Sequence, residues 1–343
     1  MRRRRSLELA LIVALVALVL PTARPQSLPT KKEAAVLLEN AAAAANLETA
    51  GTPPFHLVAK VHYELGRELF DGAYELFWAS AARYRENYKM GTAVEIRLAL
   101  GDKLYVLRNT PILDLPLWRL RTTMRSNYHG FHPSNPKVDK VYSARIGGES
   151  QTCVESQRNY EWMRACFDPI TKQVVSLSNA LKFPEDVSSA DGNFFNAEQS
   201  DFVSFGAKRY PRRIAHRYED EKMDVEITSL DQVTRYETEL FTPPTGAQAY
   251  DWCPNPGSKG KISFESMPRI VPKSTVGLLA YYVFVGADGK AKSSGPMRSG
   301  GSLLNDRMKE WIDTHKFPTY SCEGKPIPYE IVLLPPFLFP TDR

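Results

Sequence analysis

Few residues in this 343-residue sequence have the types and spacing that catalysis requires. His129 and His132 form a closely spaced histidine pair, but no carboxylate lies beside them, so we interpret the segment as a loop and not a metal site. Ser258 and Lys261 have the Ser-x-x-Lys spacing of a nucleophile and its base, yet they lie in a flexible stretch, and catalysis needs a rigid surround. Asp168 stands directly before a proline and is typical of a turn.

The familiar signatures of catalysis are missing from the sequence. It contains no G-x-S-x-G, no H-E-x-x-H, no phosphate-binding loop and no dinucleotide fingerprint. We therefore expect a protein that is not an enzyme and that needs no cofactor and no metal. A hydrolase without a known signature is the enzymatic alternative.

The four cysteines are Cys153, Cys166, Cys253 and Cys322. An even number of cysteines in an oxidising compartment indicates disulfides, and four cysteines allow three pairings. Cys153 and Cys166 lie in neighbouring strand-like runs that a hairpin would bring together, so we pair them, and Cys253 then pairs with Cys322. The alternative is a zinc site, which no C-x-x-C and no nearby histidine supports.

The amino terminus has the features of an export signal. Four arginines at positions 2–5 precede an apolar run over 7–20 that only Glu8 interrupts, and Pro21, Thr22 and Ala23 follow. The run is about 14 residues long, whereas a helix that crosses a bilayer needs about 20. We assign residues 1–26 to a cleaved signal peptide and expect the protein in the periplasm or cell envelope of a Gram-negative bacterium.

Most of the positive charge belongs to that signal. The whole chain has a net charge of +5, of which residues 1–26 contribute +4, so the remainder has a charge of about +1. A nucleic-acid partner is disfavoured, because binding to nucleic acid needs a concentrated basic face. The densest basic stretch, residues 208–213, is interpreted as a solvated strand or turn.

The first two hundred residues after the signal predict one helix and then many strands. Thr30 and Glu33 have the spacing of a capping box, and apolar residues at helical spacing follow as far as Asn46. Antiparallel strands are then predicted over 56–65, 72–80, 83–89, 93–100, 103–108, 140–146, 150–155, 160–167, 173–177, 201–205, 212–218 and 223–230. We expect one face of this sheet to be buried and the other to face water.

Two details of that region suggest a concave sheet with a cover. In the run 93–100, Val94, Ile96 and Leu98 alternate with charged residues, so we expect these three to face the interior. The segment 115–128 has Leu117, Leu120 and Met124 at helical spacing with arginines between them. We expect this helix to cover an opening of the sheet, with its charged ends at the rim.

A proline- and glycine-rich stretch at 246–262 predicts a linker between two domains, at 28–245 and 263–343. The second domain has an apolar strand over 277–285, a tight turn, a helix from Ser302 and a final strand over 327–334. This order of elements is β-β-α-β.

The second domain resembles the TonB C-terminal domain family. The resemblance lies in four features: the strand end and turn at 283–290, Ser299-Gly300-Gly301 before a helix, the aromatic helix end at 311–318, and Gly324-Lys325-Pro326-Ile327 before the last strand. Val271-Pro272 stands near the place where that family has Tyr-Pro. The resemblance implies that this unit docks an envelope protein. A TonB-type energy transducer also needs a membrane anchor and a long proline-rich spacer, which the sequence lacks.

The first domain looks like the LolA/LolB superfamily of lipoprotein-sorting proteins. After the N-terminal helix, the similar segments are residues 55–59, Asp71-Gly72-Ala73-Tyr74, Arg83-Tyr84-Arg85-Glu86 and Phe167-Asp168-Pro169. The resemblance covers about residues 28–245. It implies a curved antiparallel sheet, a half-barrel, that wraps round helices and leaves an apolar concavity able to hold an acyl chain.

Together these features predict an α+β protein, with a half-barrel followed by a small C-terminal domain. We expect a non-enzymatic envelope protein that binds a lipid or another hydrophobic ligand and docks an envelope protein. A purely structural interaction module is the main alternative, in which the same apolar residues pack on one another. The candidate cavity lining is Leu76, Trp78, Val94, Ile96, Leu98, Leu117 and Leu120.

Overall fold

The computed structural model describes residues 27–49, 51–125, 137–158, 161–181, 195–218, 220–253, 280–299 and 301–333. Outside these residues lie the predicted signal peptide, the histidine pair at 129 and 132, and Ser258 and Lys261. Among the residues that the structure does describe, no helix is long and apolar enough to cross a membrane.

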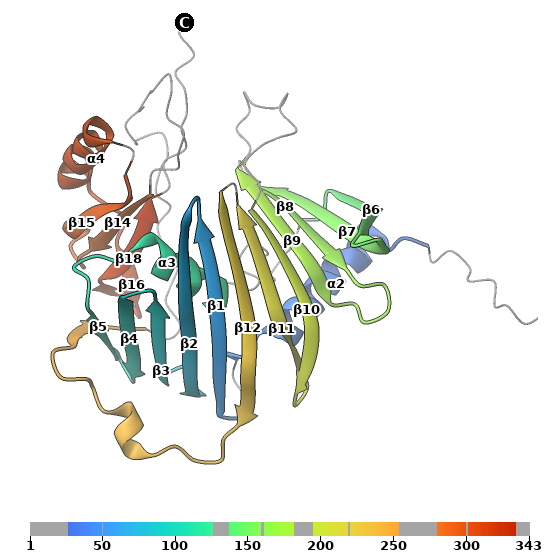
Figure 1. Cartoon of the computed structure of the whole chain (residues 1–343), viewed down its shortest axis with the longest axis horizontal. Helices are drawn as coiled ribbons and strands as arrows, with labels where there is room; N and C mark the ends of the chain where they lie inside the picture. Colours follow the sequence, from blue (N-terminus) through green and yellow to red (C-terminus); the bar gives the residue numbers. More distant parts are fainter. Residues whose placement is uncertain are drawn as a thin grey trace, which may run out of the picture.

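One large antiparallel sheet of 13 strands dominates the described residues (Figure 1). Its order is β13-β5-β4-β3-β2-β1-β12-β11-β10-β9-β8-β7-β6, and it is open, because its two end strands do not pair with each other. The strands are β1 (Phe55–Leu65), β2 (Glu68–Ser80), β3 (Arg83–Met90), β4 (Ala93–Leu100), β5 (Lys103–Arg108), β6 (Lys140–Ile146), β7 (Glu149–Arg158), β8 (Glu161–Phe167), β9 (Val174–Leu181), β10 (Phe195–Phe205), β11 (Lys208–Tyr218), β12 (Glu221–Gln232) and β13 (Gln248–Asp251).

Two helices pack on one face of this sheet, which we call the inner face. Helix α2 (Lys31–Ala45) begins at the predicted capping box, in which the Glu33 amide donates to Thr30 Oγ1 at 3.3 Å. Its alanine-rich side packs on strands β7–β10. Helix α3 (Leu115–Arg125) packs on the half of the sheet that contains β1–β3 and β12. Figure 1 shows α2 behind the strands β9–β11 and α3 beside β1 and β2.

The opposite, outer face is covered in part by the chain that follows β12. A short 3₁₀ helix, η2 (Thr238–Phe241), lies against β3 there. The Arg85 guanidinium donates to the Leu240 carbonyl at 3.0 Å, and Arg83 lies over the Phe241 ring at 4.5 Å. Cover of this kind lets an outer-face residue of β3 or β4 be buried without facing the interior of the half-barrel.

The C-terminal unit comprises β14 (Ala280–Val285), β15 (Ala291–Arg298), α4 (Ser302–Thr314), β16 (Tyr320–Cys322), β17 (Lys325–Ile327) and β18 (Tyr329–Leu333). Strands β15, β14 and β18 form a three-stranded sheet, and β16 pairs with β17. The predicted order β-β-α-β is present, with the β16–β17 hairpin added before the last strand. Residues 248–251, which we had assigned to the linker, form the edge strand β13 of the large sheet.

Strand β14 is apolar throughout because both of its faces are covered. Val283 and Val285 pack with α4 in the core of the C-terminal unit. Tyr282 belongs to the large core beneath α3, and Phe284 packs against that core. A strand whose two faces are both buried has a continuous run of apolar residues in its sequence. The C-terminal sheet therefore lies between α4 and the inner face of the large sheet.

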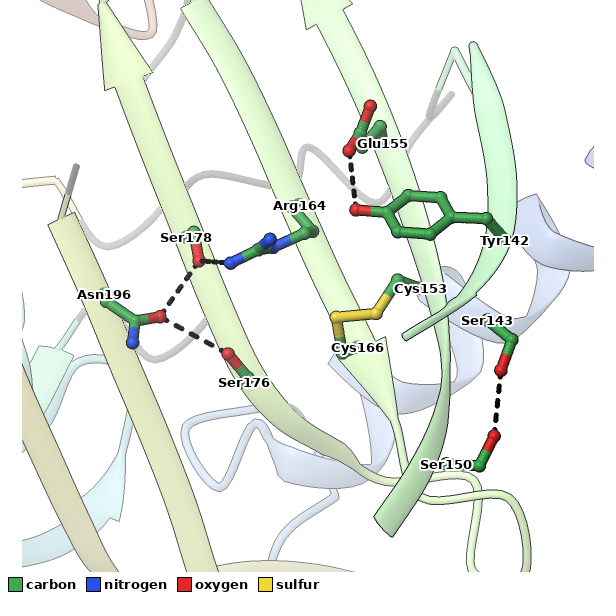
Figure 2. Close-up of a disulfide and its surroundings, with 10 residues drawn as sticks. All are labelled: Tyr142, Ser143, Ser150, Cys153, Glu155, Arg164, Cys166, Ser176, Ser178 and Asn196. Atoms are coloured by element: carbon green, nitrogen blue, oxygen red, sulfur yellow. Dashed lines mark hydrogen bonds between the residues drawn. A yellow bond between two sulfur atoms is a disulfide. The ribbon is translucent and has the colours of Figure 1, made fainter. Parts of the chain in front are cut away.

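The two predicted disulfides are confirmed. Cys153 pairs with Cys166 across β7 and β8, and Cys253, just after β13, pairs with Cys322 in β16. Figure 2 shows the first disulfide on the outer face, with α2 (blue) behind the strands. Beside it, Arg164 donates to Ser178 at 3.1 Å and Tyr142 donates to Glu155 at 2.6 Å.

We predict that the second disulfide stabilises the chain more than the first. The Cys153–Cys166 link closes a separation of 13 residues and the Cys253–Cys322 link a separation of 69. Restriction of the unfolded chain then contributes about 3 and about 4 kcal/mol. Urea unfolding of the two double Cys→Ser variants measures both values. An equal or reversed order would contradict this entropic account.

Candidate functional site

Four of the seven candidate lining residues come together on the inner face. Leu76 and Trp78 point inward from β2, and Leu117 and Leu120 meet them from α3 in one apolar core. Each of these side chains is at most 3% exposed. The structure therefore brings these four side chains into one packed core, and their role as a cavity lining stays a prediction.

The three candidates from β4 do not join that core, and this part of the prediction is wrong. Val94 and Ile96 are half-buried on the outer face, and Leu98 is buried there. Leu98 pairs in register with Arg85, which contacts the segment around η2, so cover from outside accounts for its burial. The charged residues between them, Glu95 and Arg97, face the interior instead.

These inward charges form a compact cluster that we call the Glu95–Glu330 cluster. Glu95, with 0% exposure, accepts from Arg108 Nε at 2.6 Å and from Arg121 Nη1 at 3.2 Å. Glu330 on β18 accepts from Arg108 at 2.8 Å, Arg121 at 2.8 Å and Arg97 at 3.0 Å. Three arginines from β4, β5 and α3 thus share two carboxylates, one of which belongs to the C-terminal unit.

The cluster remains ionised at neutral pH. Burial by itself would raise the pKa of Glu330, but the guanidinium groups of Arg121, Arg97 and Arg108 outweigh it and hold this pKa well below its usual range. The pKa of Glu95 is lowered for the same reason, against its burial. The cluster carries a net charge of about +1, from three guanidinium groups and two carboxylates.

A second buried ion pair joins α3 to β12. Arg119 holds Glu221 with two hydrogen bonds, of 2.6 and 2.9 Å, and the Tyr63 hydroxyl donates to the same carboxylate at 2.9 Å. Burial and the neighbouring Glu221 charge raise the pKa of Tyr63, so it stays protonated. Arg298 of β15 also contacts this site, 3.7 Å from Glu221 and 2.9 Å from Asp220. The C-terminal unit therefore meets the large sheet at three charged sites, the third being the ion pair of Lys325 on β17 with Asp251 on β13, at 2.9 Å.

A groove on the outer face is a further candidate site. It has a volume of about 560 Å³ and is lined by residues of strands β1, β2, β6, β9, β10, β11 and β12. Sequence patterns do not reveal it, because its residues are solvent-facing positions of strands that are adjacent only in the folded sheet. Its charged or ionisable lining residues are Lys60, His62, Asp71, Glu198, Arg213, Asp224 and Glu226.

Asp168 is a turn residue, as predicted. Its carboxylate accepts from the amides of Ile170 at 3.0 Å and Thr171 at 2.6 Å. The hydrogen bond from the Thr171 amide is the main cause that lowers the pKa of Asp168. Among the described residues, no group of three or more histidine, cysteine or acidic side chains is placed to hold a metal ion.

Comparison with known proteins shows likeness in fold. No protein-family model matches the chain, and no curated protein matches it. A LolA superfamily protein from Nitrosomonas europaea has a TM-score of 0.37 and 11% identity, over 62% of this chain and 98% of that protein. A DUF1329 family protein from Desulfovibrio piger has a TM-score of 0.41 and 8% identity, over 62% and 97%.

The MucA/MucB complex from Pseudomonas aeruginosa is similar over more of the chain, with 88% of this chain and 92% of that chain covered. Its TM-score is 0.28 and its identity 12%. At these TM-scores the neighbours carry no inference about ligand or partner, and the resemblance of the C-terminal unit to TonB stays a prediction.

We predict that Glu95→Gln destabilises the protein by about 3 to 5 kcal/mol, because it leaves buried arginines without a partner charge. Glu226→Gln, an exposed neutralisation on β12, is the matched control and should change the free energy of unfolding by less than about 0.5 kcal/mol. Urea denaturation measures both variants. Equal losses in the free energy of unfolding would show that the burial of Glu95 among arginines does not contribute to stability.

We also predict a pH dependence from His216, a buried residue of β11 whose Nδ1 lies 3.3 Å from Thr123 Oγ1 of α3. Burial, and then Arg119 and Arg217, hold the pKa of His216 well below its ordinary value. The unfolded chain takes up a proton below pH about 6.5 that the folded chain does not, so stability falls by about 1.4 kcal/mol per pH unit as the pH drops.

The test is urea unfolding between pH 7 and pH 5, a window above the ordinary carboxylate pKa. His216→Gln should remove most of this slope. His315→Gln is the control, because burial lowers the pKa of that less buried histidine too, and most of the slope should remain in this variant. A slope that survives in His216→Gln would refute the assignment.

Proposed function

We propose that this chain is a non-enzymatic binding protein of the bacterial envelope, and that the inner face of its half-barrel holds a lipid or another hydrophobic ligand. One observation carries the proposal. The apolar inner face around Leu76 and Trp78 is covered by separate attached parts: an 11-residue helix, α3, and the C-terminal unit, which contributes Tyr282. Ligand sites of this kind are concave and mostly apolar.

In this proposal the described structure is the closed form. The sheet is open, so its inner face can be uncovered without breaking the pairing of its strands. The C-terminal unit meets the large sheet through charged contacts at Glu330 and Arg298 as well as through apolar ones. Water can solvate those charges on opening, and an acyl chain can replace the apolar contacts that are lost.

The second part of the proposal is that the C-terminal unit docks an envelope protein. Its sheet has β15 at one edge and β18 at the other, and unpaired strand edges can accept a partner strand. Leu303 at the start of α4 is 65% exposed and adds an apolar contact beside this sheet. An export signal at residues 1–26 would place the protein where such partners reside.

A protein-interaction module without a small ligand is the second candidate function. The tight packing of the four inner-face residues favours it, and so does the outer groove. That groove has charges of both signs and suits a polar segment of a partner protein better than an acyl chain. In this alternative the inner face is an ordinary core.

Binding of 1-dodecanol, a neutral twelve-carbon chain, separates the two functions. We predict saturable binding to the wild-type protein and a raised melting temperature, since a ligand at 100 times its Kd stabilises by about 2.7 kcal/mol. Native mass spectrometry of protein purified from envelope extracts should show retained lipid. If no lipid is retained and dodecanol neither binds nor stabilises, the interaction module is the better function.

A matched pair of variants locates the site. Leu76→Gln places a polar amide on the inner face and should weaken dodecanol binding about tenfold or more, the equivalent of about 1.4 kcal/mol. Ile96→Gln makes the same kind of change on the outer face and should leave binding unchanged. Circular dichroism checks that both variants fold. Equal losses in the two variants would place the ligand elsewhere.

A further inference from the structure

The three arginines of the Glu95–Glu330 cluster are brought together by the half-barrel alone. Arg97 comes from β4, Arg108 from β5 and Arg121 from α3. Their side chains are at most 16% exposed, and all three contact the Glu330 carboxylate. Glu330 is the one member of the cluster that the C-terminal unit supplies.

The charges show what the half-barrel would present without Glu330. Three guanidinium groups would share the single carboxylate of Glu95, so these four groups together would carry a charge of about +2. Glu86 and Asp114 of the half-barrel also interact electrostatically with Arg97 and Arg108. Guanidinium groups bind carboxylates through paired, charge-assisted hydrogen bonds. An anion that takes the place of Glu330 would restore the charge pairing of these groups. The half-barrel thus contains a built carboxylate receptor, and Glu330 fills it.

The receptor adjoins the apolar inner face. Arg121 and Leu117 are four residues apart on α3 and so lie on the same side of the helix. Leu117 belongs to the apolar core. The ring of Tyr282 lies in the same core, and its hydroxyl donates to Glu330 at 3.0 Å. A ligand with an anionic end and a long apolar chain could reach both regions at once.

We infer that the three arginines bind the carboxylate of a single-chain amphiphile whose alkyl chain lies on the inner face, and that Glu330 holds the site closed until this ligand displaces it. The inference rests on the proposed hydrophobic-ligand function and names the chemical class of the ligand. The carboxylate of Glu330 and that of the ligand compete for one site. Ligand binding therefore weakens docking of the C-terminal unit, and docking weakens ligand binding by the same factor.

The displaced unit would stay attached to the chain. The disulfide Cys253–Cys322 ties β16 to the end of β13, and β13 stays paired with β5 in the large sheet. Opening would also break the contact of Arg298 with Asp220, 2.9 Å apart in the closed form. The C-terminal unit then acts as a tethered cover whose position reports whether the arginine site holds a ligand.

The test compares laurate, 1-dodecanol and acetate on the oxidised full-length chain, with all probes below the concentrations at which they aggregate. Laurate and dodecanol have the same chain length, and acetate has the carboxylate alone. We expect laurate to bind at least tenfold more tightly than dodecanol, and acetate to bind far more weakly than either. Small-angle scattering should show a larger radius of gyration with laurate than with dodecanol.

Two variants test the competition. Glu330→Gln removes the competing carboxylate and weakens docking of the C-terminal unit, so it should tighten laurate binding about tenfold and should not weaken dodecanol binding. Glu310→Gln, on the exposed side of α4 in the same unit, is the matched control and should change neither affinity. If Glu330→Gln does not fold, the wild-type protein tests the same competition through the increase in its radius of gyration when laurate is added.

The outcomes separate this inference from the function on which it rests. If laurate and dodecanol bind equally well and Glu330→Gln alters neither affinity, the arginine site is not a headgroup site, although the apolar-ligand function stands. If laurate binds tightly without any change in scattering, Glu330 does not hold the C-terminal unit closed. If neither chain binds, both proposals fall.

Discussion

The position of several elements in this protein depends on the buried ion cluster around Glu95 and Glu330. Its three arginines come from two strands and a helix, and one of its two carboxylates comes from the C-terminal unit. Removing either carboxylate would leave excess positive charge in a poorly hydrated place. The cluster therefore fixes the relative positions of α3, the β4–β5 hairpin and the C-terminal unit. The apolar core beneath α3 supplies most of the burial, but contact between apolar surfaces does not fix orientation. The charges do, because their hydrogen bonds are directional.

The open sheet imposes a second constraint. A sheet that does not close leaves edge strands, which invite pairing with other chains. One end of this sheet is β13, only four residues long, and the other is β6, seven residues long with Lys140 and Arg145 among them. A disulfide lies close to each end: Cys253 follows β13, and Cys153 is in β7 beside β6. Covalent links at these places restrain the strands that have a partner on one side only.

The inner face combines two chemistries that seldom adjoin by chance. Large apolar side chains lie next to arginines whose partner is supplied in part from outside the half-barrel. In the closed form each region is satisfied from within the chain, by α3 for the apolar face and by Glu330 for the arginines. In the proposed exchange a ligand carboxylate takes the place of Glu330 on the arginines, and water solvates the displaced Glu330. That exchange joins binding to the position of the C-terminal unit.

The sequence by itself determined the class of the elements and the disulfide pairing. The capping box at Thr30, the strand runs and the β-β-α-β order follow from local periodicity and turn chemistry, which act over a few residues. Only the tertiary structure decided which face of β4 is inside. Side chains alternate between the two faces of a strand, so Val94 and Ile96 lie on the face opposite Glu95 and Arg97. From hydrophobicity alone, the apolar pair would be expected to face the interior. That inference failed because partners from β5, α3 and β18, up to 233 positions away in the sequence, neutralise the buried charges, while the η2 segment covers part of the outer face. Local patterns contain no information about partners so distant, so neither the arginine site nor the outer groove could be read from them.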